Sequence, residues 1–217
     1  MKSQSLRVVL LVGIVLAAVS LIISARQLRL PGVDTGYQPI QPIAYSHRLH
    51  AGELAIPCQY CHYAASKSRR AGIPAASICM NCHAYVTSSL GALREEEKAA
   101  KAAGRDIRPI ESLELRKLYN ALGLGDDLKP DPSKEKSPIV WTRVHDLPDF
   151  AYFDHRPHVK AMVACQSCHG PVETMERVRQ EASLTMGWCV SCHRKNSERT
   201  ESGRPVHPPL DCATCHY

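Results

Sequence analysis

One five-residue pattern, Cys-x-x-Cys-His, occurs five times in this chain of 217 residues. The copies are residues 58–62, 79–83, 165–169, 189–193 and 212–216, and together they contain all ten cysteines of the chain. Two thiols one helical turn apart can add to the two vinyl groups of a haem, and the histidine after them can then reach the iron. The pattern therefore predicts five covalently bound haem c groups.

The expected cofactor contacts follow from this pattern. Thioether bonds are expected at Cys58, Cys61, Cys79, Cys82, Cys165, Cys168, Cys189, Cys192, Cys212 and Cys215, and the first axial iron ligands at His62, His83, His169, His193 and His216. Zinc sites and disulfide frameworks also use paired cysteines, but neither requires a histidine directly after the second cysteine. Chance would place one of the eleven histidines there only about once in twenty, so five occurrences favour haem.

Six histidines lie outside the motifs, and four of them form a repeated box. Residues 45–50 and 153–158 both read aromatic-x-His-x-x-His, and each box shortly precedes a Cys-x-x-Cys-His motif. Histidines three residues apart on a helical turn lie close together but point in different directions. We predict that His47 is the second ligand of the first iron and His155 that of the third. His50 and His158 are expected to reach the neighbouring haem of the same module.

Three further residues are candidates for the remaining axial position. His145, in a polar stretch that approaches the second module, is predicted as a ligand. His207 stands in a rigid proline-rich stretch that equally suits an exposed loop. Met186 lies three residues before Cys189; as a ligand it would raise the reduction potential, but methionine also fills space against rings.

The N-terminal stretch predicts a membrane anchor. Residues 8–25 carry no charge and are long enough to span a bilayer as a helix. A cleaved signal peptide is the alternative, but the position three residues before the weak Ser24-Ala25 site is Ile23, which is not small. Because bacteria attach haem c outside the cytoplasmic membrane, we expect a single-pass anchor in that inner membrane and a haem domain on the periplasmic side.

The expected fold is a mostly α-helical and irregular multihaem cytochrome c, with a transmembrane helix and a haem-filled domain of two repeated dihaem modules. The expected parts are an anchor (1–29), a tether (30–44), dihaem module one (45–84), a helical insertion (85–149), dihaem module two (150–194) and a tail with the fifth haem (195–217). Within the insertion, helices are expected at 88–103, ending at Gly104, and at 110–122. The insertion is either a spacer packed on the haem domain or a docking surface.

The composition supports a core made by cofactors. The chain has only two Phe and two Trp, which is little for a hydrophobic core, so we expect the haems to supply most of the buried apolar surface. The formal net charge of +6 would by itself suggest nucleic acid or an anionic surface as a partner. Each haem adds two propionates, so the holoprotein is not expected to be basic, and nucleic-acid binding is not expected.

In combination, the motifs, the boxes and the anchor resemble the pentahaem cytochrome c subunit (ActA-like) of alternative complex III. The resemblance depends on residues 46–54, 58–62, 71–74 with 79–83, 144–150 and 186–189, and it covers most of 45–194. The boxes also look, more distantly, like those of cytochromes c3 and c7. The family implies a quinol:electron acceptor oxidoreductase in the membrane. Its implied partners are a polytopic quinol-binding protein, an iron–sulfur protein, and a monohaem cytochrome c or other periplasmic acceptor.

Two other functions remain open at this point. A stand-alone quinol dehydrogenase of the NapC/NrfH type also has an N-terminal anchor and several haems, but Tyr63-Ala64 follows the first motif where that family often has methionine. A multihaem reductase would bind its substrate at a five-coordinate iron, which six spare histidines for five irons disfavour. We expect outer-sphere electron transfer without an independent catalytic site.

Overall fold

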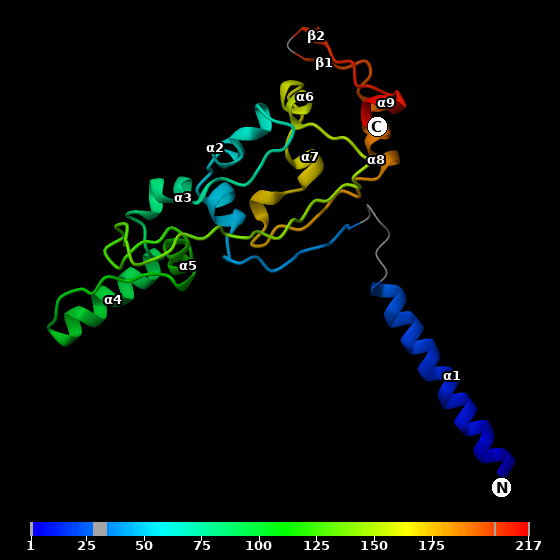
Figure 1. The fold of residues 1–217 in the computed structure, drawn as a ribbon, viewed down its shortest axis with the longest axis horizontal. Helices are drawn as coiled ribbons and strands as arrows, with labels where there is room; N and C mark the ends of the chain where they lie inside the picture. Colours follow the sequence, from blue (N-terminus) through cyan, green and yellow to red (C-terminus); the bar gives the residue numbers. More distant parts are fainter. Residues whose placement is uncertain (1, 28–33, 202, 217) are drawn as a thin grey trace.

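The computed structural model describes residues 2–27, 34–201 and 203–216, and nearly all of its regular structure is helical (Figure 1). The α-helices are α1 (Lys2–Gln27), α2 (Cys58–Cys61), α3 (Ala76–His83), α4 (Leu90–Ala103), α5 (Leu113–Ala121), α6 (His155–Lys160), α7 (Gln166–His169), α8 (Met186–Lys195) and α9 (Cys212–Cys215). Single turns of other types are η1 (Arg48–Glu53), η2 (Tyr63–Ser66) and η3 (Val172–Thr174). Strands β1 (Thr200–Glu201) and β2 (Arg204–Pro205) pair antiparallel. The prediction of a mostly helical and irregular chain is confirmed.

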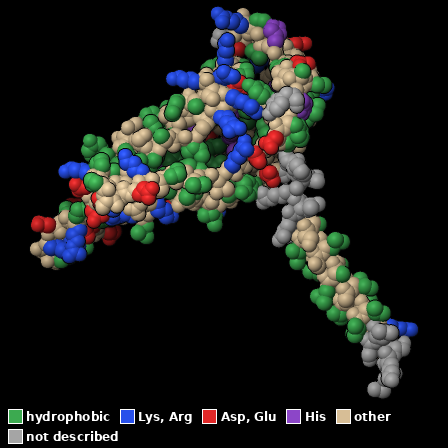
Figure 2. Space-filling model, in the orientation of Figure 1, with side chains coloured by type: hydrophobic (Ala, Val, Ile, Leu, Met, Phe, Trp, Pro, Cys, Tyr) green, Lys and Arg blue, Asp and Glu red, His purple; other side chains and the backbone are tan. Residues whose placement is uncertain are grey.

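Helix α1 contains the predicted membrane span. Residues Arg7–Ala25 have a mean hydropathy of 3.0, and none of this stretch is buried against the rest of the chain. On the face shown in Figure 2, the side chains along this helix are mainly apolar. By length and composition the helix can cross a bilayer, although a signal sequence at this position would pass the same test.

The two aromatic-x-His-x-x-His boxes have similar backbone paths into the motif that follows, with one residue more in the first path. Each box forms a helical turn, η1 or α6, and then one residue with positive φ, Ala55 (51°) or Met162 (53°), three residues before a cysteine. After that residue the chain folds back, since Ile56 N–H donates to the His50 carbonyl and Val163 N–H to the His158 carbonyl, both at 3.0 Å. The internal repeat of the sequence is therefore a repeat of conformation.

The first box packs against the chain that follows the third motif. The Arg48 N–H donates to the Met175 carbonyl at 2.9 Å, and the Arg48 side chain forms an ion pair with Glu176. Between η1 and η3, a Cβ atom added at Gly52 would overlap the Glu173 carbonyl, so only glycine allows this approach. These contacts bring the first and third motifs together in the middle of the domain.

The insertion contains the two predicted helices, with later starts than expected. Helix α4 begins at Leu90 because the Ser89 hydroxyl caps it, and it ends at Gly104 with φ 59°, as predicted. Helix α5 begins at Leu113 because Ser112 caps it, rather than at residue 110. A bidentate contact of Arg105 with Glu96 holds the chain after α4 against that helix.

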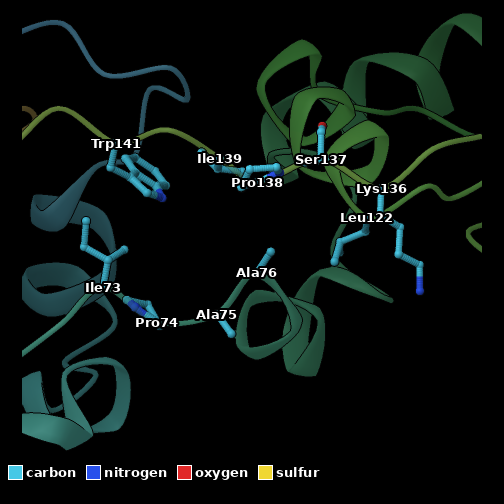
Figure 3. A pocket seen from close by; sticks show the side chains of 11 residues that line it. Ile73, Pro74, Ala75, Ala76, Leu122, Lys136, Ser137, Pro138, Ile139 and Trp141 are labelled. Carbon is cyan, nitrogen blue, oxygen red and sulfur yellow. The ribbon is translucent and has the colours of Figure 1, made fainter.

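The protein core is small and lies in the insertion. Leu118, Tyr119 and Leu124 form a buried cluster, and the partly buried Cys79 and Met80 of α3 pack against it. The insertion therefore packs on the second motif, a contact that is compatible with both interpretations of its role. An open cleft of about 490 Å³ lies beside this cluster, and its walls include Ile73, Pro74, Ala76, Leu122, Ile139 and Trp141 (Figure 3). None of the predicted iron ligands lines it.

The predicted tether has no helix or strand where it is described, and it is bound to the domain. The expected range was 30–44, of which residues 30–33 lie outside the described residues. Gly36 N–H donates to the Gln180 carbonyl at 2.7 Å, and the N–H of the fully buried Gln180 donates to the Tyr37 carbonyl at 3.0 Å. Further on, the Ala44 N–H donates to a Glu114 carboxylate oxygen at 2.7 Å. Residues 34–44 are thus part of the domain surface.

Candidate haem and iron-ligand sites

Each Cys-x-x-Cys-His motif contains a helical turn, on α2, α3, α7, α8 or α9, that places its two thiols on neighbouring turns. All ten thiols are free, and each is exposed or half-buried. Thioether formation needs thiols that a porphyrin edge can reach, so this arrangement fits haem attachment.

The motif histidines share one hydrogen-bond arrangement. Four of them direct Nδ1 at a backbone carbonyl: His62 at Gly72 (2.7 Å), His83 at Val86 (2.8 Å), His193 at Pro209 (2.6 Å) and His216 at Phe150 (3.2 Å). A carbonyl only accepts, so Nδ1 carries the proton and Nε2 keeps the lone pair that binds a metal. Four of the five predicted first ligands therefore have the tautomer that iron ligation requires.

Three box histidines face three motif histidines at one characteristic separation. The ring centroids are 6.1 Å apart for His50 and His83, 6.4 Å for His155 and His169, and 6.1 Å for His158 and His193. Two imidazoles bound through Nε2 on opposite sides of one iron have centres roughly 6 Å apart, from metal–nitrogen bonds of about 2 Å and about 1 Å from nitrogen to ring centre. The three pairs have the spacing of ligands that share an iron.

His47 lies near His62 in a more buried setting. Burial, followed by the neighbouring His62 and His50, lowers the pKa of His47 to about 4. Its Nδ1 atom is buried and has no hydrogen-bond partner among the described residues. A neutral, buried imidazole beside a motif histidine fits the residue predicted for the first iron, but its orientation is not fixed in the way that the other box histidines are.

An aromatic ring lies between the two histidines of each box. Tyr45 is 4.8 Å from His47 at 82° and 4.4 Å from His50 at 23°. Phe153 repeats this arrangement at 4.8 Å from His155 (85°) and 4.8 Å from His158 (33°). In each box the aromatic ring thus meets the first histidine edge-on and the second at a small angle. The two imidazoles of a box therefore point in different directions.

His145 contacts the motif histidine His169 directly. Their rings meet edge-on with centroids 4.4 Å apart, and the His145 Nε2 atom is 3.3 Å from the His169 Nδ1 atom. This separation is too short for two ligands on opposite sides of one iron. Burial lowers the pKa of both imidazoles, that of His169 to about 4, so both are neutral at pH 7. The geometry therefore does not favour the predicted role of His145 as an iron ligand; it favours a supporting role, as an acceptor for the His169 N–H.

The two remaining candidate ligands lie at the surface. His207 is exposed on the chain after β2, and Met186 is 65 % exposed at the first position of α8. Beside the fifth motif histidine, His216, lies the ring of Phe150 at 5.9 Å. Among the described residues, the ring contact found for His216 is that with Phe150, and the roles of His207 and Met186 stay predictions.

The cysteines that raise one another's pKa show which motifs are neighbours in space. Burial and then Cys61 raise the pKa of Cys79, and burial and then Cys58 raise that of Cys165. Burial, followed by Cys192 and Cys189, raises the pKa of Cys168 to about 11. Burial and then Cys215 raise the pKa of Cys189. The second motif thus neighbours the first, the first the third, the third the fourth, and the fourth the fifth.

Direct contacts and the ribbon agree with this order. The Asn81 amide of the second motif donates to the Tyr60 hydroxyl of the first at 3.0 Å. The fourth motif is joined to the segment directly before the fifth, because the His193 Nδ1–H donates to the Pro209 carbonyl, three residues before Cys212. In Figure 1 the motif helices follow one another across the domain as α3, α2, α7, α8 and α9.

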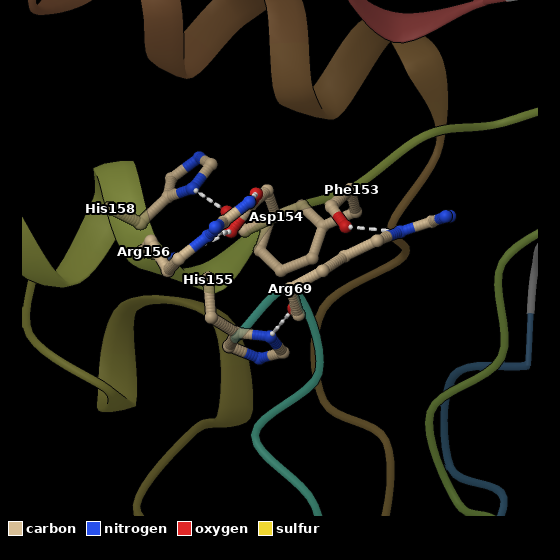
Figure 4. Close-up of polar contacts among 6 residues, drawn as sticks. All are labelled: Arg69, Phe153, Asp154, His155, Arg156 and His158. Carbon is tan, nitrogen blue, oxygen red and sulfur yellow. Dashed lines mark hydrogen bonds and ion pairs between the residues drawn. The ribbon is translucent and has the colours of Figure 1, made fainter. Parts of the chain in front are cut away.

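Two residues from elsewhere in the chain support the site, and neither was among the predicted site residues. The buried Tyr119 of the insertion donates from its hydroxyl to the His83 carbonyl at 2.7 Å. Arg69, between the first two motifs, contacts the second box (Figure 4). Nothing local in the sequence distinguishes these two residues, because their partners are 36 and 84 positions away.

The charged surface differs between the two ends of the domain. On the face shown in Figure 2, Lys and Arg side chains gather over the central and upper part of the domain with some Asp and Glu at their edge, whereas both signs mix evenly over the far end of the insertion. Carboxylates of haem propionates would favour the first arrangement. The second is an ordinary solvated surface.

Comparison with known proteins relates the chain to multihaem cytochromes. Residues 151–217 match the family model described as cytochrome c7 and related cytochrome c, a range that holds the second box and the last three motifs. The chain is 24% identical, over 132 residues, to the menaquinone reductase multiheme cytochrome c subunit of Nitratidesulfovibrio vulgaris, a match of 61% of this chain and 47% of the relative. The chain spans about half the length of this curated relative. These findings support a multihaem c-type cytochrome with covalently bound haem.

Proposed function

We propose that the chain is a membrane-anchored pentahaem electron-transfer subunit of a quinol:acceptor oxidoreductase. It relays electrons from quinol oxidation, by way of an iron–sulfur partner, to a periplasmic cytochrome or another acceptor. The name of the relative, a multihaem subunit of a menaquinone reductase, supports the link to quinones. The resemblance to alternative complex III supplies the more specific version, with a polytopic quinol-binding subunit and a monohaem cytochrome c as further partners.

The observation that carries this proposal is the spacing of the three histidine pairs. His50 with His83, His155 with His169 and His158 with His193 would close both axial positions of three irons. Bound haem supplies an iron that accepts and releases one electron at a time. Histidines on both sides hold the ligand field constant and leave no open position for a substrate. Such a site suits electron transfer better than chemistry at the iron.

We infer that the attachment sites are used in the spatial order second, first, third, fourth, fifth. The contact between Asn81 and Tyr60 and the packing of η1 on η3 support the first two steps of this order. The two end sites then differ in their surroundings. The second motif lies against the insertion through Tyr119, and the fifth lies in the C-terminal tail. Electrons would enter at one of these ends and leave at the other.

The purified full-length protein tests the function. Pyridine haemochrome analysis is expected to give five haems per chain, and electron paramagnetic resonance is expected to show them all low-spin. The protein is expected to co-purify with a polytopic membrane protein and an iron–sulfur protein, and not to oxidise a quinol analogue alone. Quinol oxidation by the isolated chain would instead identify a NapC/NrfH-type dehydrogenase. High-spin iron whose spectrum shifts with substrate would identify a reductase.

A further inference from the structure

The second box is held by a residue from the other half of the chain. The Arg69 carbonyl accepts two hydrogen bonds from His155, one from the backbone N–H at 3.1 Å and one from Nδ1 at 2.9 Å. The Arg69 Nε–H donates to the Phe153 carbonyl at 3.0 Å, and its guanidinium carbon lies 4.1 Å from the centre of the Tyr152 ring. Figure 4 shows the Arg69 side chain crossing the start of the box while its carbonyl faces the His155 ring. One residue thus holds both the backbone and the imidazole.

This arrangement is particular to His155. The other histidines of the boxes, where they have an Nδ1 partner, bond within their own box: His50 to the Ser46 carbonyl and His158 to the Asp154 carbonyl, both at 2.8 Å. His47, the counterpart of His155 in the first box, has a buried Nδ1 without a partner among the described residues. The ring of His155 is also the one that lies parallel to its motif histidine, His169, at 6°.

We propose that Arg69 is a positioning residue for the third haem: its side chain holds in place the main-chain carbonyl that receives the Nδ1–H of His155, and so fixes the ring plane of that imidazole. Because Arg69 lies on the loop between the first and second motifs, it makes the ligand geometry of the third iron depend on how the two halves of the chain dock. The planar guanidinium suits this task, because it can donate to the Phe153 carbonyl and lie against the Tyr152 ring together. This inference rests on the proposed function, since it requires His155 to be an iron ligand.

The test compares three variants of the full-length holoprotein. Arg69→Ala removes the side-chain clamp. Arg69→Lys keeps the positive charge but lacks the planar fork that spans both contacts. Arg70→Ala removes a charge from the neighbouring, exposed position of the same loop. The low-spin signal of the third haem is first assigned as the one that changes in His155→Met.

Both Arg69 variants are expected to shift the g-values and the midpoint potential of that one haem, while the other four keep theirs. Arg70→Ala is expected to give the wild-type spectrum. If Arg69→Ala does not accumulate as holoprotein, the proposal is judged from the third-haem signal of Arg69→Lys alone. A wild-type third-haem signal in Arg69→Lys, or an equal shift in Arg70→Ala, would show that only charge matters and would overturn the proposal. An unchanged low-spin spectrum in His155→Met would remove the ligand assignment, whereas a loss of haem count in the wild type would contradict the proposed function itself.

Discussion

At the scale of single residues, the partner of each Nδ1 atom decides which way an imidazole presents Nε2. Seven histidines donate from Nδ1 to a backbone carbonyl, namely His50, His62, His83, His155, His158, His193 and His216. His169 instead meets the Nε2 atom of His145. The His145 side chain can move more freely than a backbone carbonyl, so it restrains the His169 ring less. Its neutral imidazole is also a stronger base than a carbonyl oxygen. The third site is therefore the one whose ligand is supported by another side chain.

Replacing His145 shows whether this residue binds the iron or only accepts a hydrogen bond from His169. In His145→Phe the third iron is expected to stay low-spin, because His155 and His169 both remain. Its midpoint potential is expected to rise by roughly 40 mV, the one-electron equivalent of a hydrogen bond worth ~1 kcal/mol, since the His169 N–H loses its acceptor. A spectroelectrochemical titration measures this shift. The matched control is the exposed His207→Phe, for which no shift is expected. A new high-spin signal in either variant would instead identify that histidine as an iron ligand.

Some of these residues could be predicted from the sequence and others could not, and the difference has a physical reason. The thiols and histidines of the motifs are recognisable because haem attachment requires them within five consecutive positions. The box histidines are recognisable because one helical turn brings them together. The roles of Arg69 and of His145 depend on contacts with Phe153 and His169 that only the folded chain creates. No local pattern encodes such contacts, so His145 was predicted as an iron ligand while its geometry favours a supporting role.

At the scale of elements, helix α5 connects the insertion to the second motif. Its buried Tyr119 donates to the carbonyl of His83, and burial raises the pKa of the phenol. The existence of α4 and α5 could be predicted from apolar spacing and from Gly104. Their starts were placed too early because the capping hydroxyls of Ser89 and Ser112 override propensity in the first turn. That α5 covers the second motif could not be predicted, since its apolar face does not specify a partner.

Loss of the Tyr119 hydroxyl is expected to loosen this connection without unfolding the domain. In Tyr119→Phe the His83 carbonyl loses its donor, at a cost of about 1 kcal/mol. Hydrogen exchange measured by mass spectrometry is expected to accelerate roughly fivefold in α5 and at the end of α3, and to stay unchanged in α8. Tyr85→Phe is the control, because that side chain is 87% exposed and should leave exchange unaltered. Equal exchange in the two variants would show that α5 is held by its apolar contacts alone.

At the scale of the whole molecule, the order of the attachment sites in space differs from their order in the chain. The second motif lies at one end, and the first lies between the second and the third. This order depends on the packing of η1 against η3, where Gly52 approaches Glu173. Five Cys-x-x-Cys-His motifs and a mostly helical fold could be predicted from the sequence. The spatial order could not, because its central step, the first motif beside the third, arises from contacts between segments more than a hundred residues apart.

Removing one site tests the order. In Cys165→Ala/Cys168→Ala, which lacks the central attachment, rapid reduction from one end is expected to stop after two sites. In Cys212→Ala/Cys215→Ala, which lacks an end site, the four others are expected to exchange electrons as before. Stopped-flow spectra of the holoproteins measure both outcomes. Undiminished exchange across the chain in the first variant would show that the sites do not form a single line.

The aromatic residue inside each box has a consequence for how such a protein can be tuned. Tyr45 touches both His47 and His50, and Phe153 touches both His155 and His158. If these histidines bind iron as proposed, a substitution at either position would perturb two neighbouring redox centres at once. A change in the difference between the reduction potentials of those two centres therefore requires substitutions at other groups. These are the carbonyl and side-chain acceptors that each bond the Nδ1–H of a single imidazole. Related chains should then vary more readily at these acceptors than at the shared ring.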